Sequence, residues 1–221
     1  MNAIDSLIVF RDHEPRSAAM HMAVDEALLL RQRAPTLRFY SWRAPAVSFG
    51  YFGRFEEAAR LAPDRELVRR WTGGGVVLHG NDLTYSFVVP ASHPFCERSS
   101  QETYAALHEA IRAALYGEGI TATLADKSAP KVSEACFANP VRADLLVCGE
   151  KVAGGAQRRT RGGLLHQGSI QVPSLSRDFA FCFAAKLSAN FQNCPLPPEL
   201  STAAEALAKT KYATRGWLTR R

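Results

Sequence analysis

The feature that most constrains the fold is the segment RRWTGGGVVLHGNDLTYSFVVP, residues 69–90, in which two arginines precede three consecutive glycines. Apolar and β-branched runs surround the glycines and predict strands over 66–71, 76–80 and 83–90. A simple hairpin needs only one Asn-Gly or Asp-Gly pair. Three glycines add a backbone entropy cost that a turn does not require. We therefore expect another group to approach this backbone closely.

Capping residues and apolar periodicity predict two long helices. Ser17 can cap a helix over 17–34. Its apolar stripe has helical spacing and consists of Met20, Ala23, Ala27 and Leu30. Ser99 and Glu102 match a capping box before the second helix. That helix is expected to end at Gly117 or Gly119, and further helices are expected over 56–62, 176–191 and 200–221.

Aromatic and β-branched segments predict the sheet. Segments 37–42 and 46–52 lie between prolines and Gly53, and we interpret them as a pair of neighbouring strands. A hairpin is expected over 143–159 with its turn at Gly149–Glu150. Other strands are expected over 6–10, 120–125 and 163–173. Helices interleaved with strands and hairpins predict an α+β fold with a mixed or antiparallel sheet.

Length and composition favour one globular domain over 1–221, because 221 residues with 47% hydrophobic content suffice for one sizeable core. No apolar run approaches the length of a membrane span. The start MNAIDSLIVFRDHEP lacks the basic and then apolar pattern of a signal peptide, so a cytoplasmic location is expected. The five cysteines are widely spaced without a CxxC pair, which favours reduced thiols and predicts no metal site.

The net charge of +6 favours acidic partners through long-range steering. Basic residues are scattered, apart from the segments QRRTRGG and TRGWLTRR. An acidic protein partner is therefore favoured over nucleic acid, for which no recognition motif is present. A mildly basic soluble enzyme without such a partner stays an alternative.

Three segments carry candidate chemistry. Arg70, next to Arg69, and the glycines 73–75 suit an anionic group, since guanidinium forks match phosphate or carboxylate geometry. Lys151 lies among small residues in GEKVAGGAQRR, where it is either a cleft lysine or a solvated hairpin lysine. Cys136 in SEACFANP is either a nucleophile activated by a nearby cation or a small buried hydrophobe.

The remaining histidines and cysteines are weaker candidates. His79 and His166 each end a short apolar run, and each is either a site residue or a core histidine bound to a backbone carbonyl. Cys148 in DLLVC and Cys182 in FAFCF lie in apolar runs and are expected to be buried.

Taken together, these segments resemble the lipoate–protein ligase and octanoyltransferase superfamily. RRWTGGGVVLHGNDLTYS is similar to its RRxTGGGxVxHxxxLxYS signature, and GEKVAGGAQRRTRGGLLHQGSI to its GxKxxGxAQxR…LHxGS segment. MHMAVDEALL resembles its opening helix, and TLRFYSWRAPAVSFGYF its following strand pair. The resemblance covers about residues 15–185. It implies the catalytic domain fold of biotin/lipoate protein ligases, a mixed β-sheet flanked by helices.

The resemblance also implies roles for single residues. Lys151 would be the family lysine, which stabilises charge developing at the acyl carbonyl or its activating phosphate. The glycine-rich turn and Arg70 would border the pocket for a lipoyl or octanoyl chain, with His79 along the same wall. The full set of implied binding residues is Arg70, Gly73, Gly74, Gly75, His79, Gly154, Ala156 and His166.

Members of this superfamily activate the acyl group in two ways. Ligases use ATP and Mg and make an acyl-adenylate, whereas transferases take octanoyl from the thioester of acyl carrier protein through a cysteine. In the transferase branch the nucleophile lies in a C-F segment shortly before the lysine, and here Cys136-Phe137 precede Lys151. The resemblance therefore favours a cofactor-free octanoyltransferase. Its acceptors would be lipoyl domains of 2-oxoacid dehydrogenases or the glycine cleavage H protein.

Several alternatives stay open. The transferase branch often has an arginine where this chain has Gly75, and the GGG form is common in ligases, including split ligases with a separate accessory chain. The matched region leaves room for only a helix or two, which favours the transferase. A non-catalytic lipoyl-group or lipoyl-domain binding protein would keep the pocket, but Cys136 and Lys151 argue against it. A biotin ligase is disfavoured because no GRGR string is present.

Overall fold

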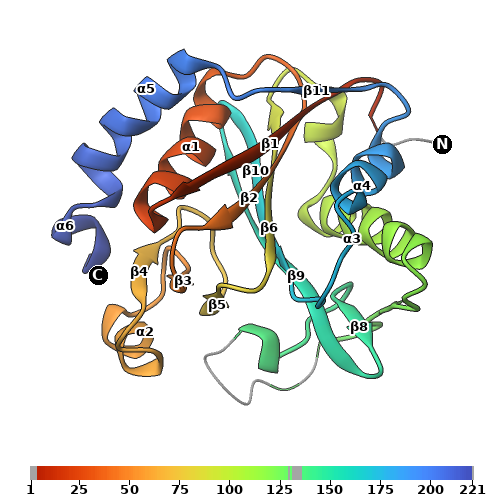
Figure 1. Cartoon of the computed structure of the whole chain (residues 1–221), viewed down its shortest axis with the longest axis horizontal. Helices are drawn as coiled ribbons and strands as arrows, with labels where there is room; N and C mark the ends of the chain where they lie inside the picture. The colour runs from red at the N-terminus through yellow and green to blue at the C-terminus, as the bar shows by residue number, and fades with distance from the viewer. Residues whose placement is uncertain (1–3, 129, 131–135, 221) are drawn as a thin grey trace.

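The computed structural model describes residues 4–128, 130 and 136–220. Within these residues the chain forms two β-sheets and six α-helices (Figure 1). The strands are β1 (Leu7–Arg16), β2 (Thr36–Trp42), β3 (Ala46–Phe49), β4 (Glu66–Arg69), β5 (Val77–His79), β6 (Leu83–Pro90), β7 (Thr123–Leu124), β8 (Leu145–Val147), β9 (Glu150–Thr160), β10 (Gly163–Ile170) and β11 (Phe191–Cys194). The helices are α1 (Ala18–Arg31), α2 (Phe55–Leu61), α3 (Ser100–Gly117), α4 (Phe179–Leu187), α5 (Pro198–Leu207) and α6 (Arg215–Leu218). Short 3₁₀ turns span Pro94–Glu97 and Cys136–Ala138, and a π-helical turn spans Ala208–Tyr212.

The larger sheet is mixed, as the sequence predicts. Its strand order in the described residues is β11-β1-β2-β6-β10-β9-β8-β7. The strand β1 pairs in parallel with both β11 and β2, and the other neighbours are antiparallel. Helices flank the sheet on both faces, with α3 and α4 on one side and α1 and α5 on the other (Figure 1).

The predicted pairing of segments 37–42 and 46–52 is wrong, because the two strands belong to different sheets. The first segment forms β2, between β1 and β6 in the large sheet. The second forms β3, between β4 and β5 in a separate three-stranded sheet. Both strands are largely buried, so the backbone N–H and C=O groups on both edges of each strand need partner strands. The turn after Trp42 carries the chain from the large sheet to the small one.

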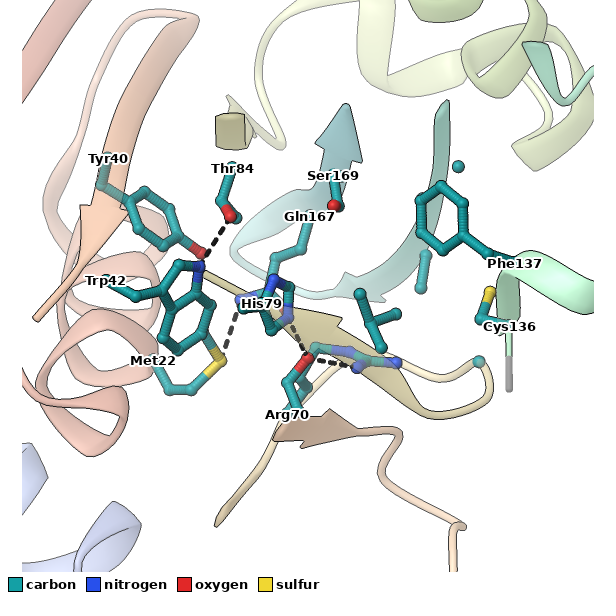
Figure 2. A pocket seen from close by; sticks show the side chains of 17 residues that line it. Met22, Tyr40, Trp42, Arg70, His79, Thr84, Cys136, Phe137, Gln167 and Ser169 are labelled. Carbon is teal, nitrogen blue, oxygen red and sulfur yellow. Dashed lines mark hydrogen bonds between the residues drawn. The ribbon is translucent and has the colours of Figure 1, made fainter. Parts of the chain in front are cut away.

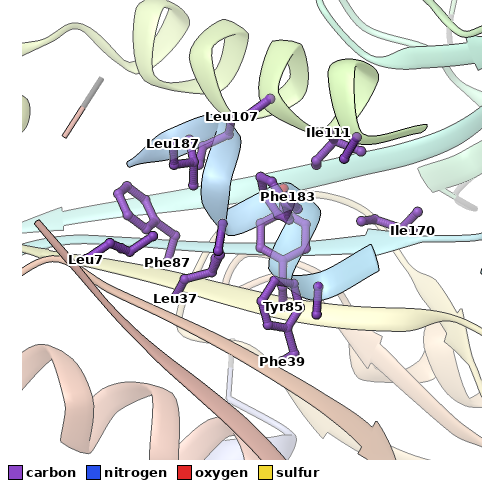
Figure 3. Packing of buried hydrophobic residues seen from close by; sticks show 14 of the residues in the cluster. Leu7, Leu37, Phe39, Tyr85, Phe87, Leu107, Ile111, Ile170, Phe183 and Leu187 are labelled. Carbon is purple, nitrogen blue, oxygen red and sulfur yellow. The ribbon is translucent and has the colours of Figure 1, made fainter. Parts of the chain in front are cut away.

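The large sheet has a hydrophobic core on each face. Figure 3 shows the first core, where Phe87 and Tyr85 of β6 pack with Phe183 of α4 and with α3. The second core lies under α1 and α5 and includes Leu28 and Leu165. Alternation along β10 sends neighbouring side chains to opposite faces. A side chain of β10 therefore lies either under α3 and α4 or on the side of α1, depending on its position along the strand.

Helix starts follow the predicted caps, whereas several ends and faces differ. The Ser17 hydroxyl accepts from the backbone of Met20 at 3.3 Å, and Ser99 and Glu102 form the capping box of α3, which ends at Gly117. Leu30 is 58% exposed, so the predicted apolar stripe of this helix reaches solvent at its last residue. The helix predicted over 200–221 is divided into α5, the π-helical turn and α6.

Two other predicted boundaries move. The helix predicted over 176–191 ends at Leu187, and Phe191 begins β11 instead. The hairpin between β8 and β9 turns one residue earlier than predicted, because Val147 pairs with Glu150. Cys148 and Gly149 form the turn with φ of 50° and 84°, the left-handed conformation that tight two-residue hairpins require. In the described part of the chain, no helix is both long and apolar enough to cross a membrane.

Candidate active site

The candidate site is a mostly apolar pocket between the two sheets (Figure 2). Tyr40 and Trp42 of β2 lie at one end of it, and Cys136 and Phe137 lie at the other. Small residues of β9 and β10, together with α1 and the glycine-rich segment, complete the lining. An apolar cavity with a few convergent polar groups is the usual form of a small-molecule site.

The glycine-rich segment is fixed by Arg70. Its guanidinium donates to the Ser48 hydroxyl at 2.7 Å and to the carbonyls of Gly73 and Gly75 at 3.0 and 2.8 Å. Gly74 has φ of +88°, a conformation that favours glycine. Burial lowers the pKa of Arg70 to about 10, and the electrostatic interaction with Cys136 partly opposes this shift. Arg70 is therefore charged at neutral pH, and much of its fork binds the chain's own carbonyls.

His79 lies in a buried chain of hydrogen bonds that begins at Arg70. Its Nε2 accepts from the Ser48 hydroxyl at 2.6 Å, and its Nδ1 donates to Asp82 at 2.8 Å, while its ring stacks on Trp42 at 4.2 Å between centroids. Burial lowers the pKa of His79, and the partner Asp82 only partly offsets this. The imidazole is therefore neutral at pH 7, which fits the tautomer that these contacts require.

Cys136 lines the pocket, and Lys151, which is not a lining residue, contacts Cys136 from beside it. The Lys151 ammonium lies 3.6 Å from the Cys136 thiol sulfur and 3.3 Å from the Cys136 carbonyl oxygen. The backbone N–H of Cys136 donates to the carbonyl of Val76 at 2.8 Å, which ties the cysteine to the end of the glycine-rich segment. Lys151 is only 8% exposed, so the solvated hairpin alternative for this lysine is wrong.

Asp144 binds the Lys151 ammonium from the other side. Its Oδ2 lies 2.8 Å from Nζ of Lys151, and both side chains are almost completely buried. The Tyr104 hydroxyl and the backbone N–H of Val141 donate to the same carboxylate. The Tyr104 oxygen in turn accepts from the backbone of Gly155 at 3.0 Å. The lysine is therefore held between a fixed carboxylate and the cysteine.

A second buried network positions Gln167, which also lines the pocket. The Gln167 amide donates to Asp25 at 2.7 Å and accepts from the Thr72 hydroxyl at 2.8 Å. Asp25 pairs at 2.7 Å with Arg38, which has no exposed surface. This network links α1, β2 and the glycine-rich segment to one wall of the pocket.

Most of the predicted binding residues lie at this pocket. Arg70, Gly74, His79, Gly154 and Ala156 line it, together with Cys136. Gly73 and Gly75 are not lining residues, and they contribute the carbonyls that hold the Arg70 guanidinium instead.

The structure does not place His166 at the pocket. Its side chain is fully buried on the face covered by α3 and α4, where Nε2 contacts the Tyr85 hydroxyl at 3.0 Å. Strand alternation is the reason, because the neighbours of His166 on β10 face the opposite side, where Gln167 lines the pocket. It is a core histidine, but the predicted backbone carbonyl partner is wrong, since Nδ1 is buried without a hydrogen-bond partner among the described residues. Burial lowers its pKa far below the usual value.

The expectation that Cys148 and Cys182 are buried is wrong, since both are exposed. Cys148 lies in the tight turn of the β8–β9 hairpin, and Cys182 lies on the outer side of α4, whose inner side carries Phe179 and Phe183. All cysteines are free thiols. Among the described residues, no group of three or more His, Cys, Asp or Glu side chains is placed to hold a metal ion.

Sequence reasoning missed several residues of this site, above all Asp144 and Gln167. Asp144 lies just before β8, and the hairpin register that sets Leu146 beside Lys151 brings its carboxylate to the lysine. An acid preceding a strand that pairs with the lysine strand was an available signal. Gln167 could have been found from its place two residues from Leu165, on the face opposite His166.

Residues 17–197 match the family described as the lipoyl protein ligase A/B catalytic domain, so the chain belongs to this family. The octanoyltransferase LipM of Oceanobacillus iheyensis is 40% identical over 170 residues, which cover 73% of this chain and 62% of that protein. The octanoyltransferase LipM of Carboxydothermus hydrogenoformans is 39% identical over 174 residues, which cover 74% and 64%. The chain thus spans about three fifths of the length of the curated relatives it matches.

Solved structures share the fold at lower identity. A lipoate-protein ligase A bound with ATP is 21% identical with a TM-score of 0.77, covering 98% of this chain and 99% of that one. A chain from a structural analysis of a bi-partite lipoate protein ligase and its E2 lipoyl domain from Thermoplasma acidophilum is 20% identical with a TM-score of 0.74, covering 98% and 96%. The predicted catalytic domain fold is therefore confirmed.

Proposed function

We propose that this chain is an acyltransferase of protein lipoylation, which moves an octanoyl or lipoyl group from a carrier-protein thioester to a lysine of a lipoyl domain. The observation that carries the proposal is the contact of the Lys151 ammonium, at 3.6 Å, with the thiol of Cys136, which lines an apolar pocket. A thiol beside an ammonium that can donate a proton suits thioester exchange, because the leaving thiolate of the donor must be protonated. The identity of about 40% with proteins named octanoyltransferase supports the same reaction.

The lining of the pocket suits an acyl chain. Gly74, Gly154 and Ala156 leave room along its walls, and Met22 and Trp42 offer apolar contacts at the end distant from Cys136 (Figure 2). In this proposal the chain lies between these residues, with its carbonyl carbon at Cys136. Lys151 stabilises charge that develops on the carbonyl oxygen.

The proposed partners are acidic proteins. The net charge of +6 favours encounter with an acidic acyl carrier protein as octanoyl donor. The proposed acceptors are lipoyl domains of 2-oxoacid dehydrogenases or the glycine cleavage H protein. The exchange of one thioester for another and then for an amide is driven by the donor thioester, so we propose that no cofactor takes part. We also propose that residues 1–221 act as one catalytic domain.

The second candidate is an ATP-dependent lipoate–protein ligase acting through an acyl-adenylate. The observation in its favour is Gly75, which completes the triple glycine common in ligases. In that reaction Lys151 would meet the activating phosphate, and Cys136 would be dispensable.

A donor comparison separates the two candidates. The protein is incubated with an apo lipoyl domain and either octanoyl-acyl carrier protein, or octanoate with ATP and Mg. Mass spectrometry of the lipoyl domain measures the added octanoyl group, and Cys136→Ala is run with both donors. We expect acylation from the carrier protein alone and none with Cys136→Ala. Acylation from octanoate and ATP that persists in Cys136→Ala assigns the ligase reaction instead.

A further inference from the structure

Three charged side chains lie near Cys136, and only two of them form an ion pair with each other. Lys151 and Asp144 are paired at 2.8 Å, and Arg70 stands apart from them on the glycine-rich segment. All three are largely buried, with exposed fractions of 8%, 0% and 6%. A buried charge is costly in free energy unless an opposite charge lies close to it. A buried cation without an ionic partner would therefore favour a negative charge on the neighbouring Cys136.

The charge of Lys151 is already neutralised. Asp144 is in direct contact with the ammonium, and the carboxylate is fixed by hydrogen bonds from Tyr104 and Val141. Lys151 therefore donates a hydrogen bond to the Cys136 sulfur at 3.6 Å, while the carboxylate of Asp144, at 2.8 Å, balances its positive charge. It adds little net positive potential at the thiol.

The charge of Arg70 has no such match. Among the described residues, no carboxylate forms an ion pair with it, and its contacts are the neutral Ser48 hydroxyl and the carbonyls of Gly73 and Gly75. The next residue, Val76, holds the backbone of Cys136 at 2.8 Å. Figure 2 shows the Arg70 guanidinium extending toward the end of the pocket where Cys136 lies. A thiolate at Cys136 is thus well placed to balance this buried cation.

Of the other titratable groups near the pocket, His79, Tyr40 and Tyr104 are uncharged at neutral pH, whereas Asp82 is ionised. Burial lowers the pKa of His79 and raises the pKa of both Tyr40 and Tyr104. Asp82 is paired with His79 on the side of the ring distant from Ser48. Asp82 is separated from Arg70 by the His79 ring and the Ser48 hydroxyl, so Arg70, Lys151 and Asp144 are the charged groups on which the proposal for the Cys136 thiol rests.

We propose that Arg70 is the cation that stabilises the Cys136 thiolate, and that Lys151, neutralised by Asp144, carries the proton of the transfer reaction. The first half stands on the arrangement of charges alone. The second half rests on the proposed function, since it concerns protons exchanged during acyl transfer.

The proposed steps balance in atoms and charge. The Cys136 thiolate attacks the donor thioester, its bond to the acyl carbon forms, and the bond to the donor sulfur breaks. The leaving thiolate takes a proton from the Lys151 ammonium. The acceptor amine, arriving uncharged, then attacks the acyl-cysteine, the carbon–nitrogen bond forms, and the thiolate leaves again. The proton lost by the amine returns to Lys151.

The four groups stay neutral as a set throughout this cycle. Before reaction, thiolate and Asp144 carry two negative charges, and Arg70 and Lys151 carry two positive charges. In the acyl-enzyme, Cys136 and Lys151 are both uncharged, and Arg70 and Asp144 remain. A buried site that never holds net charge avoids the desolvation cost of an unpaired ion.

The test measures thiolate formation directly. The rate of iodoacetamide alkylation of Cys136 is followed against pH by peptide mass spectrometry, with the exposed Cys182 of α4 as an internal control in each sample. Three variants are compared with the wild type: Arg70→Met, Asp144→Asn, and the double variant Asp144→Asn/Lys151→Met, which removes the ion pair as a unit. Circular dichroism checks the fold of each.

The variants shift the Cys136 profile in different directions. Arg70→Met should move it to higher pH by about one to three units, the usual effect of losing an adjacent opposite charge. Asp144→Asn leaves the ammonium unmatched and should move the profile to lower pH. The double variant should move it by less than half as much as Arg70→Met. The proposal is overturned if the Cys136 alkylation profile of Arg70→Met does not shift. It is also overturned if the profile of the double variant shifts to higher pH as far as that of Arg70→Met. If Arg70→Met does not fold, an Asp144→Asn profile that fails to move to lower pH overturns it.

Acyl transfer tests the proton-carrier half. The double variant should keep a reactive Cys136 yet transfer octanoyl at least 100-fold more slowly, and added small primary amines should restore part of the rate. Transfer at the wild-type rate by the double variant contradicts this role. A wild-type protein that never forms acyl-Cys136 refutes the proposed function instead, and the alkylation profiles still decide the role of Arg70.

Discussion

Gly154→Ala is predicted to disable acyl transfer by displacing Lys151. A Cβ atom at position 154 would lie 2.5 Å from Cε and 2.7 Å from Nζ of Lys151. Non-bonded carbon atoms sit about 3.5–4.0 Å apart, so the end of the lysine must move by about 1 Å or more. The atoms in conflict belong to the tip of a flexible side chain, and the strand backbone can stay in place. Both contacts of the ammonium, with Asp144 and with Cys136, are then lost or lengthened.

A misplacement of about 1 Å in a catalytic group can cost on the order of 100-fold in rate. We therefore expect octanoyl transfer from the carrier protein to fall by about that factor in Gly154→Ala, measured by mass spectrometry of the lipoyl domain. Circular dichroism and thermal unfolding should be close to wild type. The matched control is Gly162→Ala in the hairpin after β9, where a Cβ meets Thr160 Oγ1 at an ordinary 3.6 Å. A folded Gly154→Ala protein with at least half of the wild-type rate refutes this reasoning.

Three further predictions follow from single residues. Gly74→Val should weaken acyl-substrate binding, because φ is +88° and a Cβ would lie 3.3 Å from both Ala156 and the Arg70 guanidinium; unchanged affinity in a folded variant contradicts this. Lys151→Ala should slow transfer by roughly a hundredfold or more, since one well-placed donor contributes about 3–4 kcal/mol, and a near-normal rate returns the lysine to a structural role. Burial alone would raise the pKa of Asp82, but His79 and Ser169 lower it to about 2 from an ordinary 3.8. Its stabilisation, about 2 kcal/mol, is complete above about pH 4 and lost as the pH falls toward 2. Urea unfolding of wild type and Asp82→Asn should therefore converge as the pH falls from 4 to 2, and a difference that does not change with pH contradicts the assignment.

Local chemistry made much of this site predictable from the sequence. Ser17 and Ser99 cap their helices because capping depends on a few adjacent residues. Gly74 has a left-handed conformation at the centre of the triple glycine. The cysteine and lysine motifs lie only 15 residues apart, and the β8–β9 hairpin between them brings Lys151 back to Cys136.

What the sequence could not provide depends on long-range placement. The alternation of β10 separates His166 from Gln167, but only the packing of α3 and α4 against one face decides that His166 is in the core. The separation of β2 and β3 into two sheets arises from partners that lie far away in sequence. The position of Asp144 before a strand marks it as a candidate acid, but its contact with Lys151 depends on a register shift between Leu145 and Leu146. Charge pairing at the site was therefore invisible before the strands were placed.

The measurement that tests the central claim most directly is the detection of an acyl group on Cys136. The protein is mixed with octanoyl-acyl carrier protein without acceptor, and intact and peptide mass spectrometry locate any added mass. We expect one octanoyl group on the Cys136 peptide, released by hydroxylamine as a thioester, transferred on addition of apo lipoyl domain, and absent in Cys136→Ser. A lipoyl domain that is octanoylated at full rate by Cys136→Ser, with no thioester on the wild-type protein, would contradict transfer through this cysteine.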